Sequence, residues 1–258
     1  MARFGDKTLL RQLVPGYSKH RPLLKFYLME VILTLLVVMI ARPQMGTKIS
    51  KDKREGIEAM IALDISNSML AEDVAPSRLE RSKRLVEDLL NHFTNDKIGL
   101  VVFAGDAFVQ LPITADYISA KMFLDNISPS LIGSQGTDIA KAIELSQHSF
   151  TQNSKFGKAI IIITDGENHE GGAEEMARKA QKAGIRVFIL GIGSTAGAPI
   201  PMDDGSYLQD KNGQTVMTKL NEDMCRKVAE AGKGMYIHVD NTAAAEQMLD
   251  NEIAKMQH

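Results

Sequence analysis

Between residue 57 and the C-terminal end, short apolar runs alternate with segments in which apolar residues recur every three or four positions. The runs are rich in β-branched residues and predict strands, whereas the segments with the longer period predict amphipathic helices. The expected strands span residues 57–65, 98–103, 107–113, 158–164, 185–190 and 235–239. The expected helices span residues 79–93, 117–127, 138–150, 174–183 and 220–231, with a closing helix from residue 242.

This alternation predicts an α/β domain with a mostly parallel central sheet and helices on both faces. The run at 158–164 is the most apolar, so we expect it near the centre of the sheet. Only a short turn around Gly105 and Asp106 separates the runs at 98–103 and 107–113, which leaves no room for a crossover helix. We therefore expect one antiparallel strand at an edge of the sheet.

Residues 191–219 form a long connection between a strand and the next helix. It contains Asp204-Gly205 and Asn212-Gly213, two strong tight-turn signals. These turns predict a small hairpin on the surface. A role in recognising a partner is the alternative that the sequence leaves open.

The N-terminal segment has the composition of a membrane helix. Residues 23–41 are apolar with few exceptions, and about 20 such residues span a bilayer. Glu30 is unfavourable deep in lipid, where a charge costs roughly 2.5–3.5 kcal/mol, so it is expected near an interface or beside a partner. The core of a signal peptide is the alternative, but residues 39–41 make a poor cleavage site.

Basic residues occur on both sides of this helix, so the positive-inside rule hardly distinguishes its two orientations. The expected organisation is a basic segment at 1–21, a transmembrane helix at 22–41, a linker at 42–56 and one globular domain at 57–258.

Composition and charge exclude several other classes of protein. The 258 residues are 44% hydrophobic and 24% charged, which is ordinary for a globular chain. The net charge of −2 gives no reason to expect nucleic acid as a partner. Cys225 is the only cysteine, so no intrachain disulfide or thiolate cluster can form, and it fits a packed core position. The basic run from Arg78 to Arg84 alternates with apolar residues and indicates a solvated helix face.

Three short polar segments stand where strands are expected to end or a helix to begin. Asp64, Ser66 and Ser68 follow the first strand, Asp165 follows the strand at 158–164, and Thr137 precedes a helix. The carboxyl ends of parallel strands meet at one edge of a sheet, where ligands bind. Side chains alternate along an extended segment, so Asp64, Ser66 and Ser68 are expected to point the same way.

Two carboxylates and three hydroxyls are suitable ligands for a hard divalent cation. Mg²⁺ is the expected ion, with Mn²⁺ or Ca²⁺ as alternatives. Because the set contains few carboxylates, the ion would remain ready to accept one more acidic ligand. This pattern favours an adhesion module and not an enzyme.

These segments resemble the metal-ion-dependent adhesion site (MIDAS) of von Willebrand factor type A domains. The residues that carry the resemblance are Asp64-Ile-Ser-Asn-Ser68, Gly136-Thr137-Asp and Thr-Asp165-Gly-Glu-Asn. More narrowly, Ala41-Arg42-Pro43-Gln44, Pro76-Ser77-Arg78-Leu79-Glu80 and Pro199-Ile200-Pro201 are similar to segments of the bacterial aerotolerance-associated Bat membrane proteins.

The resemblance implies a Rossmann-like domain that holds Mg²⁺ through Ser66, Ser68 and Thr137, with Asp64 and Asp165 acting directly or through water. A Glu or Asp of a protein partner would fill the vacant position. It also implies a single-pass protein of the bacterial inner membrane with a periplasmic domain, beside other Bat proteins and a MoxR-type AAA+ ATPase, in stress response or aerotolerance. The family has further membrane helices, which residues 1–21 and the end at His258 do not provide; this is consistent with a fragment or short variant.

Two alternatives remain open. In a metal-dependent hydrolase the same ion would activate water, with Glu167 or His169 as the base. In the other alternative, the domain has lost metal binding and keeps only the scaffold. Retention of all five oxygen-bearing residues argues against this last possibility.

Overall fold

The structure, a computed structural model, describes residues 20–41, 56–93, 96–152, 156–168, 171–202, 204–240 and 242–256. The chain divides into two compact units, Met1–Asp52 and Lys53–His258. Each unit is considered by itself. Almost all of the predicted basic segment and linker lies outside the described residues.

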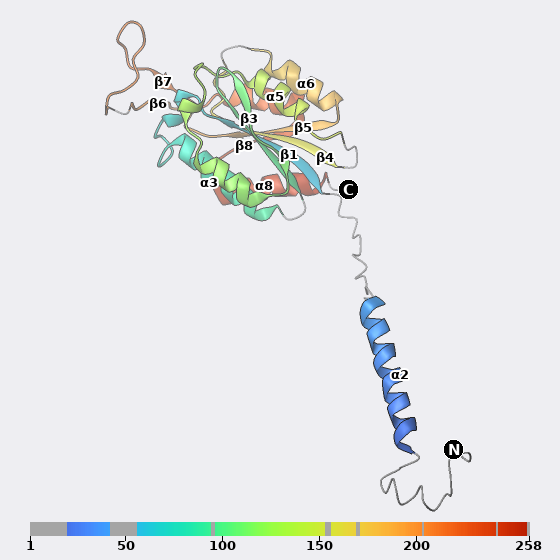
Figure 1. Cartoon of the computed structure of the whole chain (residues 1–258). Coiled ribbons are helices and arrows are strands. Elements are labelled where there is room, and N and C mark those ends of the chain that lie inside the picture. The colour runs from blue at the N-terminus through green and yellow to red at the C-terminus, as the bar shows by residue number, and fades with distance from the viewer. Residues whose placement is uncertain are drawn as a thin grey trace, which may run out of the picture. The chain divides into compact units, whose positions relative to one another are not determined.

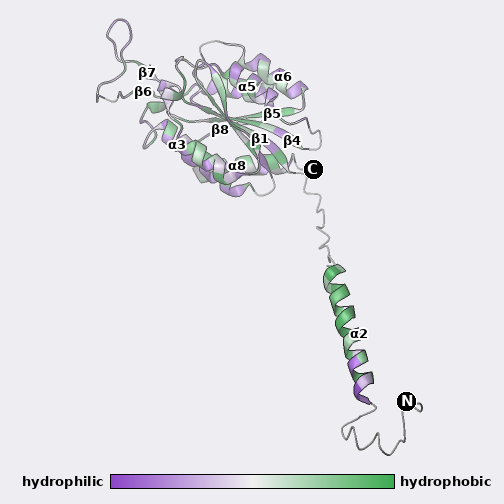
Figure 2. Cartoon of the chain, in the orientation of Figure 1, coloured by the Kyte–Doolittle hydropathy of each residue, from purple (hydrophilic) through white to green (hydrophobic). Residues whose placement is uncertain are grey.

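The described part of the first unit is α2 (His20–Ala41), a helix of 22 residues. At the usual rise per residue it is about 33 Å long, which matches a bilayer core of about 30 Å. The mean hydropathy of an 18-residue window of this helix is 2.3, and Figure 2 shows hydrophobic residues along most of its length after a hydrophilic start. Among the described helices, α2 is the one that is long and apolar enough to cross a membrane.

The second unit is built on a sheet of six strands in the order β3-β2-β1-β4-β5-β8 (Figure 1). Their bounds are β1 Ile57–Asp64, β2 Lys97–Phe103, β3 Ala107–Thr114, β4 Gly157–Thr164, β5 Ile185–Gly191 and β8 Lys233–His238. All neighbours pair in parallel except β2 and β3, which are antiparallel. The expectations of a mostly parallel sheet, an antiparallel edge strand and a central position for the 158–164 run are therefore confirmed.

Edge strand β3 is irregular. Its register against β2 shifts twice between Ile98 and Val101. It also contains Pro112, which has no backbone N–H to donate. Phe108 and Val109 of this strand are exposed.

Helices cover both faces of the sheet, because the strands are apolar on both sides. On β1, Ile61 and Leu63 belong to one core cluster, whereas Met60 and Ala62 belong to the other. Figure 1 shows α3 and α8 on one face and α5 and α6 on the other. The helices are α3 Arg78–His92, α4 Tyr117–Asp125, α5 Ile139–His148, α6 Ala173–Lys182, α7 Glu222–Ala231 and α8 Thr242–Ala254.

Capping residues explain where these helices begin. The Ser77 side chain accepts a hydrogen bond from Glu80 N at the start of α3. Asp138 caps α5 in the same way, and Asn221 caps α7 by accepting from Met224 N. Helix α7 therefore begins after Asn221, two residues later than predicted.

Two short 3-10 helices complete the set, η1 (Asn67–Leu70) and η2 (Pro129–Leu131). Because of η1, residues 64–68 are not the one extended segment that was predicted. The chain leaves β1 at Asp64 and enters the η1 turn three residues later. Ser68 thus lies in a 3-10 turn, and the expectation that it points the same way as Asp64 and Ser66 through strand alternation is wrong.

The predicted hairpin within residues 191–219 is confirmed. Strands β6 (Ala198–Pro199) and β7 (Met217–Thr218) pair antiparallel, and Pro201 and Gln209 form further bridges inside the excursion. Gly205 and Gly213 have φ values of +80° and +76°, which the predicted turns require. We refer to residues 198–218 as the β6–β7 excursion.

Candidate metal centre

The ends of β1 and β4 bring two of the predicted segments together. These strands are neighbours in parallel register, with Leu63 opposite Ile163. Asp64 is the last residue of β1, and Asp165 directly follows β4. Their carboxyl groups are close enough for Asp165 to raise the pKa of Asp64.

The two serines lie on the same side of this edge. Ser66 Oγ and Ser68 Oγ are 3.0 Å apart. The backbone N–H of Ser66 donates to Asp64 Oδ1 at 2.9 Å, and the Ser68 side chain hydrogen-bonds to Asp165. The η1 turn, and not an extended chain, makes this convergence possible, because it folds Ser68 back toward Ser66.

Thr137 reaches the edge from the loop before α5. Asp138 N donates to Ala104 O at 2.8 Å, and Ile65 N donates to Phe103 O at the same distance. Adjacent residues at the end of β2 thus hold the Thr137 loop and the loop of the two serines. Gly136 adopts a φ of +109°, which lets the backbone turn just before Thr137.

All five predicted donors are buried: Asp64 and Asp165 are 0% exposed, Thr137 1%, Ser66 2% and Ser68 7%. Burial, and after it the neighbouring Asp165, raise the pKa of Asp64 to about 7, against the opposing hydrogen bonds from Thr164 and Ser66. Burial also raises the pKa of Asp165, although Ser68 and Arg78 oppose it. Two neighbouring carboxyls are therefore costly to ionise here, and a nearby cation would relieve that cost.

The groups that hold these carboxyls are not among the residues predicted from the sequence. The Thr164 hydroxyl donates to Asp64 Oδ2 at 2.6 Å. Arg78 Nη1 donates to Asp165 Oδ2 at 2.8 Å, and Arg78 is fully buried, so its assignment to a solvated helix face is wrong. One signal was available in the sequence. Arg78 lies at the start of a predicted helix, where a positive charge is unfavourable because it opposes the helix dipole, so a compensating carboxylate is expected nearby.

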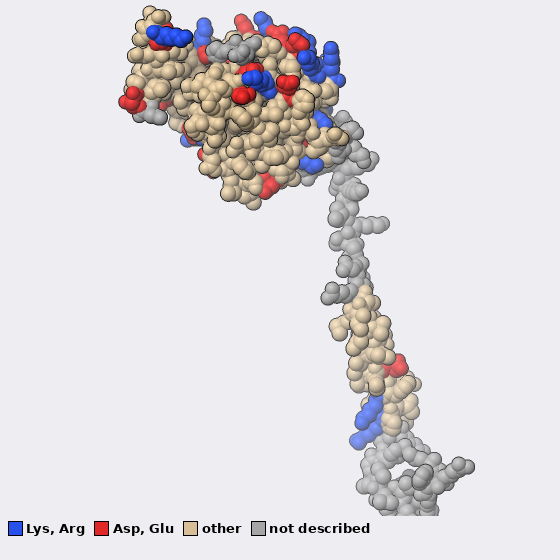
Figure 3. All heavy atoms as spheres, turned by 45° about the horizontal axis from the view of Figure 1, so that its top comes forward, with Lys and Arg blue, Asp and Glu red and all other residues tan. Residues whose placement is uncertain are grey.

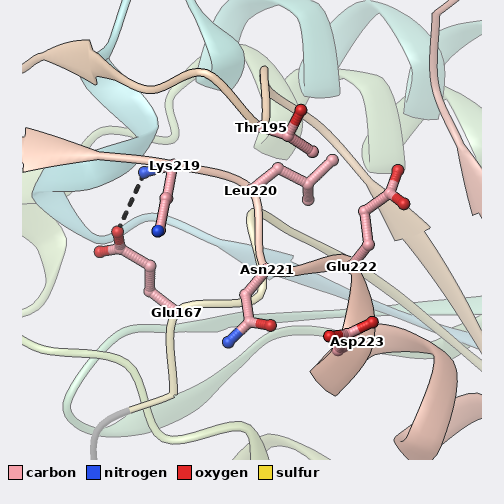
Figure 4. A pocket seen from close by; sticks show the side chains of 7 residues that line it. All are labelled: Glu167, Thr195, Lys219, Leu220, Asn221, Glu222 and Asp223. Carbon is pink, nitrogen blue, oxygen red and sulfur yellow. Dashed lines mark hydrogen bonds between the residues drawn. The ribbon is translucent and has the colours of Figure 1, made fainter.

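A pocket of about 590 Å³ opens beside Glu167, two residues after Asp165, and none of the five predicted donors lines it. Figure 4 shows its lining, which consists of Glu167, Thr195, Lys219, Leu220, Asn221, Glu222 and Asp223. Glu167 Oε1 accepts hydrogen bonds from Thr218 Oγ1 at 2.9 Å and from Lys219 N at 3.2 Å. Asn221 N donates to Asp165 O at 2.9 Å, so the pocket wall and the Asp165 loop are joined.

The types of donor atom at this site determine which metal ion it could hold. Within the described part of the chain, no three His, Cys, Asp or Glu side chains form a metal cluster. Hydroxyl and carboxylate oxygens are the donors present, and they suit a hard cation such as Mg²⁺. Of the two bases that a hydrolase could use, Glu167 is engaged by Thr218 and Lys219, and His169 lies outside the described residues.

Charged side chains of both signs are mixed on the globular unit. On the face in Figure 3, acidic and basic groups lie near one another along the upper part, and much of the remaining face has neither. Asp64 and Asp165 are buried, so their carboxyl groups are not part of this charged surface.

Comparison with known proteins gives the family. Residues 59–167 match the von Willebrand factor type A domain. The chain is 31% identical over 164 residues to an uncharacterized protein of Borreliella burgdorferi, covering 62% of this chain and 48% of that protein. It is 27% identical over 257 residues to a UPF0353 protein of Nocardia farcinica, covering 92% and 73%. The chain thus spans about half the length of the Borreliella relative.

Solved structures agree with this assignment. The conserved hypothetical protein BatB from Bacteroides thetaiotaomicron is 57% identical, with a TM-score of 0.76, over 78% of this chain and 98% of that one. An aerotolerance-related membrane protein from Bacteroides fragilis is 56% identical, with a TM-score of 0.76, over 78% and 100%. Proximal thread matrix protein 1 from the mussel byssus, described with a zinc-occupied MIDAS, shares the fold at 16% identity and a TM-score of 0.58, over 79% and 46%. The chain belongs to the von Willebrand factor type A domain family, in the group of the aerotolerance-related Bat proteins.

Proposed function

We propose that this chain is a membrane-anchored adhesion protein that holds a divalent cation and uses it to bind an acidic side chain of a protein partner. Asp64, Ser66, Ser68, Thr137 and Asp165 would hold the ion, with the two aspartates acting directly or through water. The proposal is supported by the contacts that link Asp64, Ser66, Ser68 and Asp165 at the ends of β1 and β4. Thr137 is also buried, in a loop held to the end of β2 by the bond from Asp138 N to Ala104 O.

The bound ion would supply an exchangeable coordination position for one further carboxylate oxygen. The protein's own residues do the rest. Thr164 and the Ser66 N–H orient Asp64, Ser68 orients Asp165, and the η1 turn keeps the two hydroxyls 3.0 Å apart. Burial of these groups limits their contact with bulk water, which strengthens an ion–carboxylate attraction relative to its value in bulk solvent.

Mg²⁺ is the proposed ion, because the donors are oxygen atoms and three of them are neutral hydroxyls. Mn²⁺ and Ca²⁺ accept the same ligands. The zinc reported in the mussel protein supports the idea that this fold can hold a divalent cation. The pocket beside Glu167, whose wall is joined to the Asp165 loop through Asn221, would offer room for residues that flank the partner's acid.

The proposed location is the bacterial inner membrane. The length and hydropathy of α2 support a membrane anchor, as does the description of the Bacteroides fragilis relative as a membrane protein. A single pass with the domain in the periplasm, and partners that include other Bat proteins and a MoxR-type AAA+ ATPase, complete the proposal. We place the protein among binding proteins and not among enzymes.

The test is capture of partners from native membranes by the full-length protein. Partners cross-linked in the presence of Mg²⁺ are identified by mass spectrometry for the wild type and for Asp64→Ala and Thr137→Ala. We expect both substitutions, and EDTA, to remove the same set of partners. Thr215→Ala, at an exposed position of the excursion, is the matched control. An unchanged set of partners after both substitutions and EDTA would refute the proposal.

A further inference from the structure

Arg78 is buried between two carboxylates at the metal edge. Its Nη1 donates to Asp165 Oδ2 at 2.8 Å. On its other side, Nε donates to Asp73 Oδ1 at 2.8 Å and Nη2 to Asp73 Oδ2 at 2.7 Å, a two-pronged contact. The guanidinium therefore lies between a candidate metal ligand and a second aspartate that is not one.

The surroundings fix the guanidinium in this position. Its remaining two N–H groups donate to Thr218, with Nη1 to Oγ1 at 3.0 Å and Nη2 to the carbonyl oxygen at 3.2 Å. All five donors of the side chain are thus used. Ser194 N donates to Asp73 Oδ2 at 2.7 Å, which holds the second carboxylate as well.

The chain also leaves room for this arrangement. Gly193 has a φ of +123°, and a Cβ placed there would lie 2.7 Å from Arg78 Nε. Any larger residue would displace the guanidinium. The loop after β5 therefore closes over Arg78, and the end of the β6–β7 excursion lies directly against it.

The charges near Asp165 decide what the loaded site attracts. Ionised Asp64, Asp73 and Asp165 carry three negative charges; a divalent cation and Arg78 together carry three positive ones. These three aspartates, Arg78 and the cation would together have no net charge. The loaded site would therefore not repel an incoming carboxylate. Without Arg78 the same group would be negative overall and would repel an acid while holding the cation more strongly.

Building on the proposed function, we propose that Arg78, with Asp73 behind it, sets the electrostatic preference of the metal site for an anionic ligand. Arg78 is a positioning residue: it binds neither the ion nor the partner, but acts through Asp165. It lowers the affinity for the cation and raises the affinity of the loaded site for a carboxylate. A purely structural role would lower both affinities together.

Three variants separate these roles, because they change the charge of the group one step at a time. Asp73→Asn removes one negative charge and keeps a side-chain oxygen that can accept the hydrogen bond from Ser194 N. Arg78→Gln removes one positive charge. The double variant Asp73→Asn/Arg78→Gln has the charge of the wild type and avoids leaving Asp73 without its partner.

The affinities are measured on the full-length protein in detergent. Mn²⁺ binding is followed by calorimetry, and acetate binding to the Mn²⁺-loaded protein by the loss of water-proton relaxation. We expect acetate affinity to increase from Arg78→Gln, through the double variant and the wild type, to Asp73→Asn, by about fivefold per unit of charge. Mn²⁺ affinity should follow the opposite order.

Failures of the two proposals are distinguishable. If the wild type does not bind Mn²⁺, the proposed function fails. If it does bind, but Asp73→Asn leaves acetate affinity unchanged or the two affinities fall together, the role of Arg78 is refuted. If Arg78→Gln does not fold, Asp73→Asn and the double variant still test the order.

Discussion

The Thr164 hydroxyl donates to Asp64 Oδ2 at 2.6 Å and so joins the last residues of β4 and β1. Thr164 Oγ1 also accepts a hydrogen bond from Gly166 N at 3.0 Å. The same hydroxyl therefore orients one aspartate and holds the loop that carries the other. Thr164 is not one of the five predicted metal ligands. Its proposed role is to orient the ligand Asp64, and not to bind the ion.

Replacement of Thr164 by valine should weaken metal binding. The side chain keeps its shape but loses the hydroxyl, so Asp64 is no longer oriented and its ionised form loses a donor. We expect Mg²⁺ affinity to fall by about tenfold, as for other groups that orient metal ligands. Calorimetric titration of the full-length protein measures it, with Thr215→Val as the control; equal affinities in the two variants would contradict the role of Thr164.

Mg²⁺ should stabilise the fold, and Thr137→Val should abolish the effect. An ion that binds only the folded state contributes about 2.7 kcal/mol when its free concentration is about 100 times Kd. We expect the melting temperature of the wild type to rise with Mg²⁺ and return with EDTA. Circular dichroism of the full-length protein follows the transition. A similar rise in Thr137→Val would show that the stabilising ion binds elsewhere.

Gly166→Ala should destabilise the fold and displace Asp165. Gly166 has a φ of +75°, and a Cβ there would lie 2.6 Å from Cys225 Sγ and 2.7 Å from Asn221 O. Gly171, with a φ of +73° and open space around it, is the matched control. Strain from the left-handed backbone alone costs about 1–2 kcal/mol, so Gly171→Ala should show only that loss in thermal unfolding. Gly166→Ala should lose more and also bind Mg²⁺ less tightly; equal losses would count against the clash.

Cys225 should react slowly with thiol reagents in the folded protein. The side chain is fully buried, and this burial together with the charges of Asp165 and Glu222 raises the pKa of the thiol to about 12. The folded protein thus holds the thiol proton in a range where the unfolded chain loses it, so stability from this group falls as the pH rises above about 9. Near neutral pH, we expect labelling by a disulfide reagent only after unfolding. Rapid labelling of the native protein would be incompatible with this burial.

The arrangement of strands and helices could be predicted because it depends on local pattern. The β1 and β4 runs are apolar on both faces, which indicates buried parallel strands. Ser77 and Asp138 mark helix starts through hydrogen bonds that span only three residues. Glycines at 205 and 213 supply turns that need a positive φ.

The supporting groups of the site could not be predicted in the same way. Arg78 lies 87 residues from Asp165 and 140 from Thr218, and nothing local to Arg78 specifies these partners. Its helical spacing with other basic residues suggested a solvated face instead. Ser68 was expected on an extended segment, whereas a 3-10 turn brings it to Ser66. In both cases contacts between distant parts of the chain determine where the side chain lies. The local sequence pattern indicates only which type of residue is present.

The irregularity of β3 has a consequence for how copies of this protein meet. An outermost strand with free N–H and C=O groups can join the same strand of another molecule and extend one sheet into the next. Pro112 removes a donor from the middle of β3, and the shifted register against β2 bends its path. Strand β3 is therefore a poor template for edge-to-edge pairing with a second copy of the protein.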